Sequence, residues 1–240
     1  MQVVILAGGK GTRLAPLTDT LPKALVPVAG RPFADRQLAL LRAGGATRIL
    51  YAVGHMGDRI RAHVGDGGRF GLAVDYVDDG AAPLGTGGPL RLALDAGLLE
   101  PRFLVTYGDS YLPVELGPIM ASLAASGAPA LMTVFRNDGR WDGSNVAFED
   151  GRIRLYDKHG RHPEIALHHI DYGMLALTRD FVAAEIPAGE AVDLAEPLYR
   201  LSRADRLAGH RVDVRFWEIG SHAGLAELEA AIAGGTVPAP

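Results

Sequence analysis

Residues 6–28 read LAGGKGTRLAPLTDTLPKALVPV and continue an apolar run, VVILA at residues 3–7, that predicts a buried strand. Gly8, Gly9 and Gly11 carry no side chains, so the backbone N–H groups of this loop can approach an anion closely. Open α/β sheets bind their ligands at loops that follow the carboxyl ends of strands. The segment therefore predicts a phosphate-binding loop in an α/β protein.

Two cations in the same segment strengthen this interpretation. Arg13 can grip phosphate oxygens with two hydrogen bonds, and Lys23 supplies a compact positive charge. Two common phosphate loops do not fit. The P-loop needs a Gly-Lys-Ser/Thr run, which Lys10 does not provide. The dinucleotide-binding pattern needs a third glycine, which is absent here. It also needs an immediate helix, which Pro16 and Pro22 prevent.

The whole segment resembles the signature of the sugar-1-phosphate nucleotidyltransferases, GGxGTRLxPLT followed by PKxLxPV. The resemblance continues in order through most of the chain and is nearest to members acting on heptose, mannose or N-acetylmuramate 1-phosphates. It implies a single Rossmann-like, three-layer α/β domain with a mostly parallel mixed sheet over residues 1–233. Residues 1–112 would form its nucleotide-binding half, residues 113–233 its sugar-phosphate-binding half, and residues 234–240 a flexible tail.

Hydrophobic periodicity agrees with an α/β fold, because strands and helices alternate along the chain. We expect strands at 3–7, 49–53, 72–77, 103–107, 130–135, 169–176 and 212–217, and a hairpin of 145–149 with 152–156 around Asp150-Gly151. Helices are expected from Arg31-Pro32 to Gly44-Gly45 and at 60–64, 89–99, 116–126, 193–203 and 222–233.

Composition limits the function classes. The 240 residues are 48% hydrophobic, enough for one sizeable core, and carry a net charge of −4. This balance gives no general attraction to nucleic acid or to an anionic membrane. The chain has no cysteine, which excludes disulfides, thiolate catalysis and cysteine-ligated zinc. Met1-Gln2 runs straight into the first strand without a signal-type segment, so we expect a cytoplasmic enzyme.

Two carboxylates are candidates for binding Mg²⁺, the cofactor that the resemblance implies. Asp109 follows a predicted strand and matches the family's metal-binding aspartate, although an aspartate there can also simply cap a turn. Glu218 follows the last strand where the family usually has aspartate. It is one methylene longer, and it can alternatively serve as a carboxylate near the start of the helix that follows Ser221.

The remaining site residues are those that the resemblance implies. The nucleotide-binding residues would be Leu6, Ala7, Gly8, Gly9, Gly11 and Thr12, with Gly85, Thr86 and Gly87 of the turn LGTGG at 84–88. The sugar-binding residues would be Gly88, Asp157 and Asp171. Asn145, which stands where the family usually has glycine, is a further candidate for contact with the sugar. As catalytic residues, Arg13 would bind the leaving pyrophosphate, Lys23 the α- and β-phosphates and Lys158 the sugar phosphate. Lys158 is equally well explained as a surface lysine after a hairpin.

Two further features have no clear family counterpart. Trp141 lies in a polar turn, where it can stack on a ligand or plug the loop. His159, His162, His168 and His169 lie in loop and strand segments rather than on one helical face, so we interpret them as ordinary polar positions instead of zinc ligands.

The expected reaction is Mg²⁺-dependent, in-line transfer of a nucleotidyl group from a nucleoside triphosphate to a sugar 1-phosphate, with release of pyrophosphate. One alternative is a catalytically silent regulatory protein that binds nucleotide sugars. Another is transfer to phosphocholine or a phosphonate. The sequence leaves the sugar and the base open, with GTP slightly favoured, and it leaves monomer and homodimer open. We expect no nucleic-acid or membrane partner.

Overall fold

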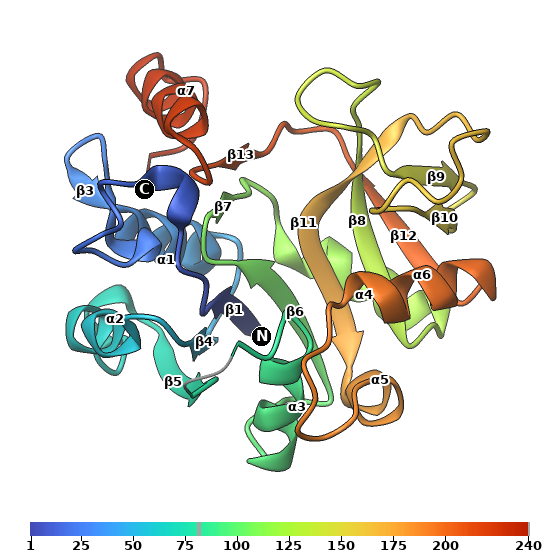
Figure 1. Ribbon diagram of the computed structural model, residues 1–240, viewed down its shortest axis with the longest axis horizontal. Helices are drawn as coiled ribbons and strands as arrows, with labels where there is room; N and C mark the ends of the chain where they lie inside the picture. The colour runs from blue at the N-terminus through green and yellow to red at the C-terminus, as the bar shows by residue number, and fades with distance from the viewer. Residues whose placement is uncertain (81–82, 240) are drawn as a thin grey trace. The chain divides into compact units, whose positions relative to one another are not determined.

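The computed structural model describes residues 1–80 and 83–239 (Figure 1). The chain divides into two compact units. Unit 1 comprises Met1–Pro83, Val105–Leu116 and Phe216–Pro240. Unit 2 comprises Leu84–Leu104 and Gly117–Arg215. This division differs from the expected halves that meet at residues 112 and 113, because the C-terminal segment returns to the N-terminal unit.

Unit 1 contains a parallel sheet in the order β5-β4-β1, with the end of β6 beside β1. Val3, Val4 and Ile5 of β1 are fully buried, which explains why this strand is an unbroken apolar run. The strands are β1 (Gln2–Ala7), β4 (Arg48–Val53), β5 (Ala73–Asp78) and β6 (Arg102–Tyr107), and the helices are α1 (Phe33–Ala43), α2 (Gly57–Val64) and α7 (His222–Ala233).

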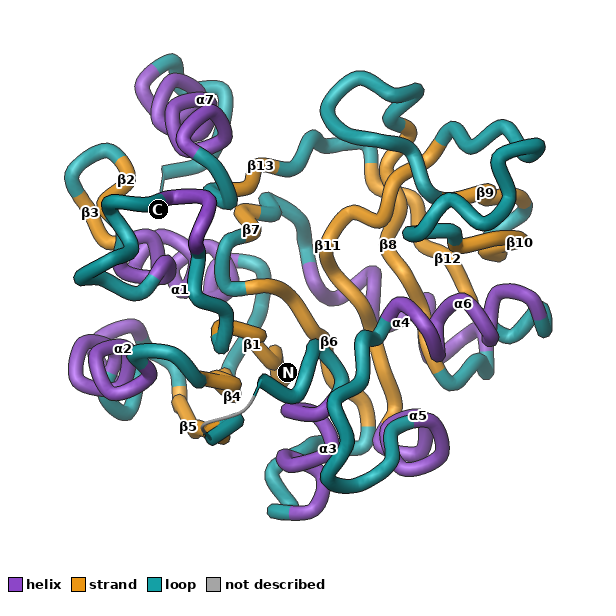
Figure 2. Tube along the Cα trace, in the orientation of Figure 1, coloured by secondary structure: helices purple, strands orange, loops and turns teal. Residues whose placement is uncertain are grey.

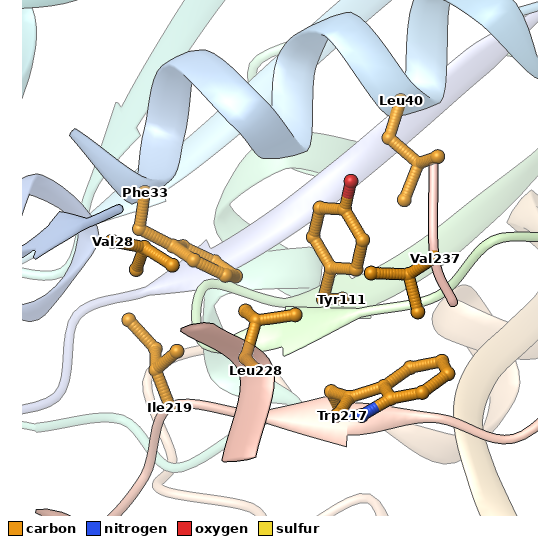
Figure 3. Packing of buried hydrophobic residues seen from close by; sticks show 8 residues of the cluster. All are labelled: Val28, Phe33, Leu40, Tyr111, Trp217, Ile219, Leu228 and Val237. Atoms are coloured by element: carbon orange, nitrogen blue, oxygen red, sulfur yellow. The ribbon is translucent and has the colours of Figure 1, made fainter. Parts of the chain in front are cut away.

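The side chains of one cluster hold the end of the chain in unit 1. Figure 3 shows Val237 in this cluster with Tyr111, Trp217 and Leu228, the last of these from α7. Val237 is 5% exposed, and the Tyr111 hydroxyl donates a hydrogen bond to the carbonyl of Pro238. Val237 and the Pro238 carbonyl therefore anchor the segment after residue 233, which the sequence led us to expect as a flexible tail.

Unit 2 contains a mixed sheet in the order β11-β8-β12-β10-β9, drawn in orange in Figure 2. β8 runs parallel to β12 and antiparallel to β11. The strands are β8 (Ala130–Arg136), β9 (Val146–Glu149), β10 (Arg152–Tyr156), β11 (His169–Thr178) and β12 (Leu207–Val212). The helices are α3 (Gly88–Asp95), α4 (Leu116–Ser126), α5 (Arg179–Glu185) and α6 (Ala195–Arg203).

Most elements predicted from the sequence are confirmed. The helices at 116–126 and 222–233 are found with those bounds, and the hairpin turns at Asp150 (φ 49°) and Gly151 (φ 74°), which suit a type I′ turn. The α/β class with a mixed sheet is confirmed.

Three differences have local causes. Arg31–Pro32 does not open a helix but forms strand β3, which pairs with β2 (Pro27–Val28) before α1 begins. The prediction of one strand at 212–217 is wrong. β12 ends at Val212, and a separate strand, β13 (Trp217–Glu218), pairs with β7 (Ser110–Tyr111). Helix α5 was not predicted. Its first turn is capped by Thr178, whose hydroxyl accepts a hydrogen bond from the Phe181 amide.

Within the described part of the chain, no helix is both long enough and apolar enough to cross a membrane.

Candidate active site

The loop after β1 turns sharply at glycines, and Lys23 packs over it. Gly11 has φ 65°, and the Thr18 hydroxyl donates to its carbonyl at 2.9 Å. A Cβ at Gly11 would lie 3.3 Å from Cβ of Lys23, so no side chain fits without displacing the lysine. The segment makes only single 3₁₀ turns, Thr12–Leu14 and Lys23–Leu25, as expected from its prolines.

Lys23 forms an ion pair with Asp109 at the end of β6. The lysine Nζ lies 2.7 Å from Asp109 Oδ2, with the two side chains 20% and 18% exposed. Two backbone hydrogen bonds fix the turn that carries Asp109: Gly108 N–H donates to the Leu6 carbonyl at 2.8 Å, and Ile219 N–H donates to the Asp109 carbonyl at 2.9 Å. The structure thus brings a predicted cation and a predicted metal ligand into direct contact.

Arg13 belongs to the same cluster. A Cβ built on Gly220 would lie 3.0 Å from Arg13 Nη2 and 3.4 Å from Asp109 Oδ2. The guanidinium and the carboxylate therefore approach the same bare Cα. A side chain at position 220 would crowd both groups, so this glycine leaves room for Arg13 beside the Lys23–Asp109 pair.

Glu218 lies on the strand that pairs with the segment directly after Asp109. It stands opposite Ser110 in the short ladder of β13 with β7, and its side chain is exposed. Two carboxylates on neighbouring segments suit a hard divalent cation, which prefers oxygen ligands and takes the rest from water and phosphate. Among the described residues no group of three or more His, Asp or Glu side chains is placed to hold a metal ion.

Asp79, at the end of β5, was not predicted as a site residue. Its Oδ2 would lie 2.6 Å from a Cβ built on Gly8 of the phosphate loop. Its Oδ1 is buried and has no hydrogen-bond partner among the described residues. Burial, and then the charge of Asp78, raise the pKa of Asp79 to about 6. Nothing in its sequence context distinguishes it from a carboxylate that ends a strand.

In unit 2 the glycine-rich turn at 84–88 is clamped by the segment before α6. Gly85 has φ 72° and bridges to Val192, whose carbonyl oxygen would be 2.4 Å from a Cβ at position 85. Gly87 N–H donates to the same carbonyl at 2.7 Å. Gly88 begins α3, and a Cβ on it would lie 2.4 Å from Cβ of Leu84. The glycines are required here by backbone packing.

Asp193 links this turn to Lys158. The Lys158 ammonium lies 3.0 Å from Asp193 Oδ2, and the Thr86 hydroxyl donates to Oδ1 at 3.2 Å. The same hydroxyl accepts from Leu194 N–H at 2.8 Å, and Asp193 Oδ1 accepts from Ala195 N–H at 3.0 Å. Burial alone would raise the pKa of Asp193, but these hydrogen bonds and the lysine together lower it.

Asp193 was also missed by the sequence analysis. In the sequence it is an aspartate at the start of a helix with Glu196 three residues later. This pattern is typical of helix capping and does not indicate the contact with Lys158.

The predicted sugar-binding side chains form a second group in unit 2. Asn145 Oδ1 accepts from the Asp171 amide at 2.9 Å, and Asp171 Oδ1 accepts from Gly173 N–H at 3.0 Å. Burial raises the pKa of Asp171 to about 6. Asp157 differs: its two oxygens accept from the amides of Arg161 at 2.9 Å and His162 at 2.7 Å. Its carboxylate therefore holds its own loop.

Trp141 does not plug its loop. The side chain is 47% exposed, and the Arg215 guanidinium lies 3.5 Å from the centre of its ring. As for the histidines, His162 contacts Glu164 and Tyr199, and His168 contacts Asp138, so they have ordinary polar partners.

Comparison with known proteins identifies the family. The family model described as nucleotidyl transferase matches residues 2–141, more than half of the chain. A mannose-1-phosphate guanylyltransferase of Mycobacterium tuberculosis is 29% identical over 246 residues, which cover 100% of this chain and 67% of that protein. An N-acetylmuramate alpha-1-phosphate uridylyltransferase of Neisseria meningitidis serogroup B is 29% identical, over 96% of this chain and 97% of that protein. Other curated relatives are longer: the chain spans 54% of one uridylyltransferase and 31% of one thymidylyltransferase.

Solved structures support the fold. The crystal structure of HddC from Yersinia pseudotuberculosis matches with a TM-score of 0.78 at 22% identity, over 96% of this chain and 99% of that one. Together with the family match, this similarity confirms the resemblance carried by residues 6–28: the chain belongs to the nucleotidyl transferase family, and its relatives there are sugar-1-phosphate nucleotidyltransferases.

Proposed function

We propose that this chain transfers a nucleotidyl group from a nucleoside triphosphate to a sugar 1-phosphate and releases pyrophosphate. The observation that carries the proposal is the cluster in which Asp109 pairs with Lys23 and approaches Gly220 together with Arg13. A phosphate loop with two cations and a carboxylate suits a triphosphate. A plain strand-to-loop turn would have no need to hold these three charges together.

For this reaction the protein needs mainly to position the two substrates and to supply positive charge. Both the attacking phosphate and the leaving pyrophosphate are anions, so catalysis consists of aligning them and neutralising developing charge. We assign Arg13 to the leaving pyrophosphate and Lys23 to the α- and β-phosphates. Lys23 would exchange its contact with Asp109 for phosphate oxygens when the nucleotide binds, since one ammonium group can serve either anion.

Asp109 and Glu218 would hold Mg²⁺, the cofactor implied by the family resemblance. When bound, the cation neutralises charge on the phosphate oxygens and fixes their geometry. Asp109 and Glu218 would thereby hold the positive charge of the cation next to the phosphate loop. The loop itself, with Leu6, Ala7, Gly8, Gly9 and Thr12, would offer backbone groups to the nucleotide.

In unit 2 we assign Lys158 to the phosphate of the sugar and Asp171 with Asn145 to its hydroxyl groups. The turn at Gly85, Thr86, Gly87 and Gly88 presents a bare backbone against which a flat ligand face can lie. Asp157 has a different part in the proposal: its oxygens orient the loop that carries Lys158. As further parts of the proposal, the enzyme acts in the cytoplasm, and monomer and homodimer remain equal candidates.

Asp193 acts in this proposal as a positioning residue for Lys158. Asp193→Asn is expected to lower kcat/KM for the sugar 1-phosphate by about 10-fold, because the ion pair of Lys158 is replaced by a hydrogen bond to an uncharged amide. The KM for the nucleoside triphosphate should stay within about twofold. Steady-state kinetics with each substrate varied in turn would measure both. Equal losses for both substrates would mean that Asp193 only supports the fold.

The substrates are best identified by pyrophosphate release across a grid. GTP, UTP, dTTP and CTP are each combined with mannose, glucose, heptose and N-acetylmuramate 1-phosphates, with phosphocholine as a non-sugar acceptor. The two relatives compared above are a guanylyltransferase and a uridylyltransferase, so the grid must span both bases. One productive sugar pair supports the proposal. Nucleotide binding without turnover would favour a silent regulatory protein, and turnover with phosphocholine alone would reverse the choice of acceptor.

A further inference from the structure

Helix α1 packs against the segment that follows Asp109. Phe33 of α1 and Tyr111 of β7 are both fully buried, and their rings meet edge to face with 6.4 Å between the ring centroids. Figure 3 shows these two rings together with Leu40, which also belongs to α1. The helix is therefore a fixed support for a side chain that reaches the turn carrying Asp109.

Gln37 of α1 reaches this turn. Its Nε2 donates hydrogen bonds to the Tyr107 carbonyl at 2.8 Å and to the Ser110 carbonyl at 2.9 Å. These two carbonyls stand on either side of Gly108 and Asp109, so one amide group holds both ends of the turn. Gln37 is 2% exposed, and water therefore does not compete for these hydrogen bonds.

The other half of the same amide has no such use. The Oε1 of Gln37 is buried without a hydrogen-bond partner among the described residues. An unpaired buried acceptor loses the hydrogen bonds that water would give it, whereas an apolar side chain of similar size loses none. The benefit of a glutamine at this position therefore comes from its NH₂ group, which makes both hydrogen bonds to the turn.

The turn connects two parts of the candidate active site. A Cβ built on Gly108 would lie 2.8 Å from Cβ of Ala7, where the phosphate loop begins, and Gly108 N–H donates to the Leu6 carbonyl at 2.8 Å. The Asp109 carbonyl accepts from the N–H of Ile219, which directly follows β13. A displacement of this turn would therefore change the position of Asp109 relative to both parts.

We propose that Gln37 is a positioning residue for Asp109. Its NH₂ group holds the turn so that the Asp109 carboxylate faces Lys23 and the cation that the proposed function requires. The inference rests on that proposed function. Gln37 acts through the backbone of the turn and not on the reacting atoms. The ion pair of Lys23 with Asp109 spans 2.7 Å, and both its strength and the alignment of the site depend on that distance.

The first test measures the turn itself, in the full chain without substrates. Gln37→Met keeps the length of the side chain and removes both hydrogen bonds. Amide hydrogen exchange followed by NMR should show the N–H groups of Gly108 and Ile219 exchanging about 10-fold faster than in the wild type, because the turn opens locally. The amides of β8 in unit 2 should keep their wild-type rates.

The second test measures the reaction with the productive substrate pair. Gln37→Met should lower kcat by about 10-fold and raise the Mg²⁺ concentration for half-maximal activity by about 10-fold, the scale expected when the support of a metal ligand is lost. The KM for the sugar 1-phosphate should stay within about twofold, because Lys158 and Asp171 belong to unit 2 and have no hydrogen bond to Gln37.

Thr133→Val is the matched control. The Thr133 side chain is fully buried in unit 2 and donates to the Met174 carbonyl at 2.6 Å. Valine has nearly the same shape and removes this buried hydrogen bond to the backbone. We expect Thr133→Val to lower the temperature of thermal unfolding while the Mg²⁺ dependence and the exchange rates of Gly108 and Ile219 stay at their wild-type values.

Gln37→Glu keeps the shape of the side chain and makes its donors depend on pH. Burial raises the pKa of a carboxyl group at this position. The acid form, which can donate one hydrogen bond, is favoured near about pH 6, and the ionised form, which repels both carbonyl oxygens, near about pH 9. The activity of Gln37→Glu relative to the wild type should therefore fall as the pH rises.

Three results would overturn the inference. The first is wild-type exchange at Gly108 and Ile219 in Gln37→Met. The second is faster exchange with an unchanged kcat and an unchanged Mg²⁺ dependence, which would limit Gln37 to supporting the fold. The third is a Gln37→Glu activity that equals the wild type across the whole pH range. By contrast, a wild type that turns over no pair of the grid would contradict the proposed function, and the exchange rates would still decide whether Gln37 holds the turn.

Discussion

Lys23→Ala is expected to lower kcat/KM by about 100- to 1000-fold, the scale of one lost electrostatic contact in a transition state. Lys23 is only 20% exposed and already holds an anion at 2.7 Å, so its ammonium is fixed where negative charge must be neutralised. Its stem lies against Gly11, which limits the positions that the ammonium can take. The measurement is steady-state pyrophosphate release with both substrates varied.

Lys10→Ala provides the matched control. Lys10 belongs to the same loop and is exposed, so its removal changes the net charge of the loop by the same amount. We expect an effect of less than about threefold, since exposed charges are largely screened. If Lys10→Ala and Lys23→Ala lowered activity equally, the loop would act only through its overall charge and the assignment of Lys23 would be wrong.

Asp109→Asn is expected to reduce activity by about 100-fold and to shift the Mg²⁺ dependence to higher concentrations. The amide keeps the size of the side chain but removes the negative charge that a hard cation requires. It also leaves Lys23 without its charged partner. A titration of activity against Mg²⁺, repeated for Mn²⁺, would measure both effects.

The variant Glu218→Asp distinguishes the role of Glu218 from that of Asp109. Aspartate is the usual residue of the resembled family at this position, so the variant should retain activity within about 10-fold. An Asp109→Asn enzyme with the wild-type Mg²⁺ curve would show that Asp109 binds no cation. Its role would then be limited to the ion pair with Lys23.

The fold was largely predictable because the strongest signals are local. The run VVILA at residues 3–7, the turn at Asp150-Gly151 and helix α7 are each encoded within a few adjacent residues. The predictions were wrong where strand pairing with a distant or neighbouring segment overrides the local preference for helix or strand. Arg31–Pro32 looks like a helix start but pairs with Pro27–Val28, and the chain at 213–216 interrupts what looks like one strand.

The candidate site was predictable only in part, for a related reason. Arg13 and Lys23 belong to one long motif, Asp109 follows a predicted strand, and the structure brings these three together. Asp79 and Asp193 have no motif of their own. Their importance comes from contacts with Gly8 and Lys158, residues 71 and 35 positions away in the chain, and no local pattern announces such contacts. Asp157 shows the converse, because the family resemblance suggests a ligand contact while its oxygens accept hydrogen bonds from the loop amides.

The central claim is that this chain catalyses attack by the phosphate of a sugar 1-phosphate on the α-phosphorus of a nucleoside triphosphate. Phosphorus NMR of a reaction with Mg²⁺, GTP and mannose 1-phosphate, or the productive pair found in the grid, tests this most directly. The account predicts pyrophosphate and a nucleoside diphosphate sugar in equal amounts, with no free orthophosphate. Release of orthophosphate with a nucleoside diphosphate, which marks attack at the γ-phosphorus, would contradict it.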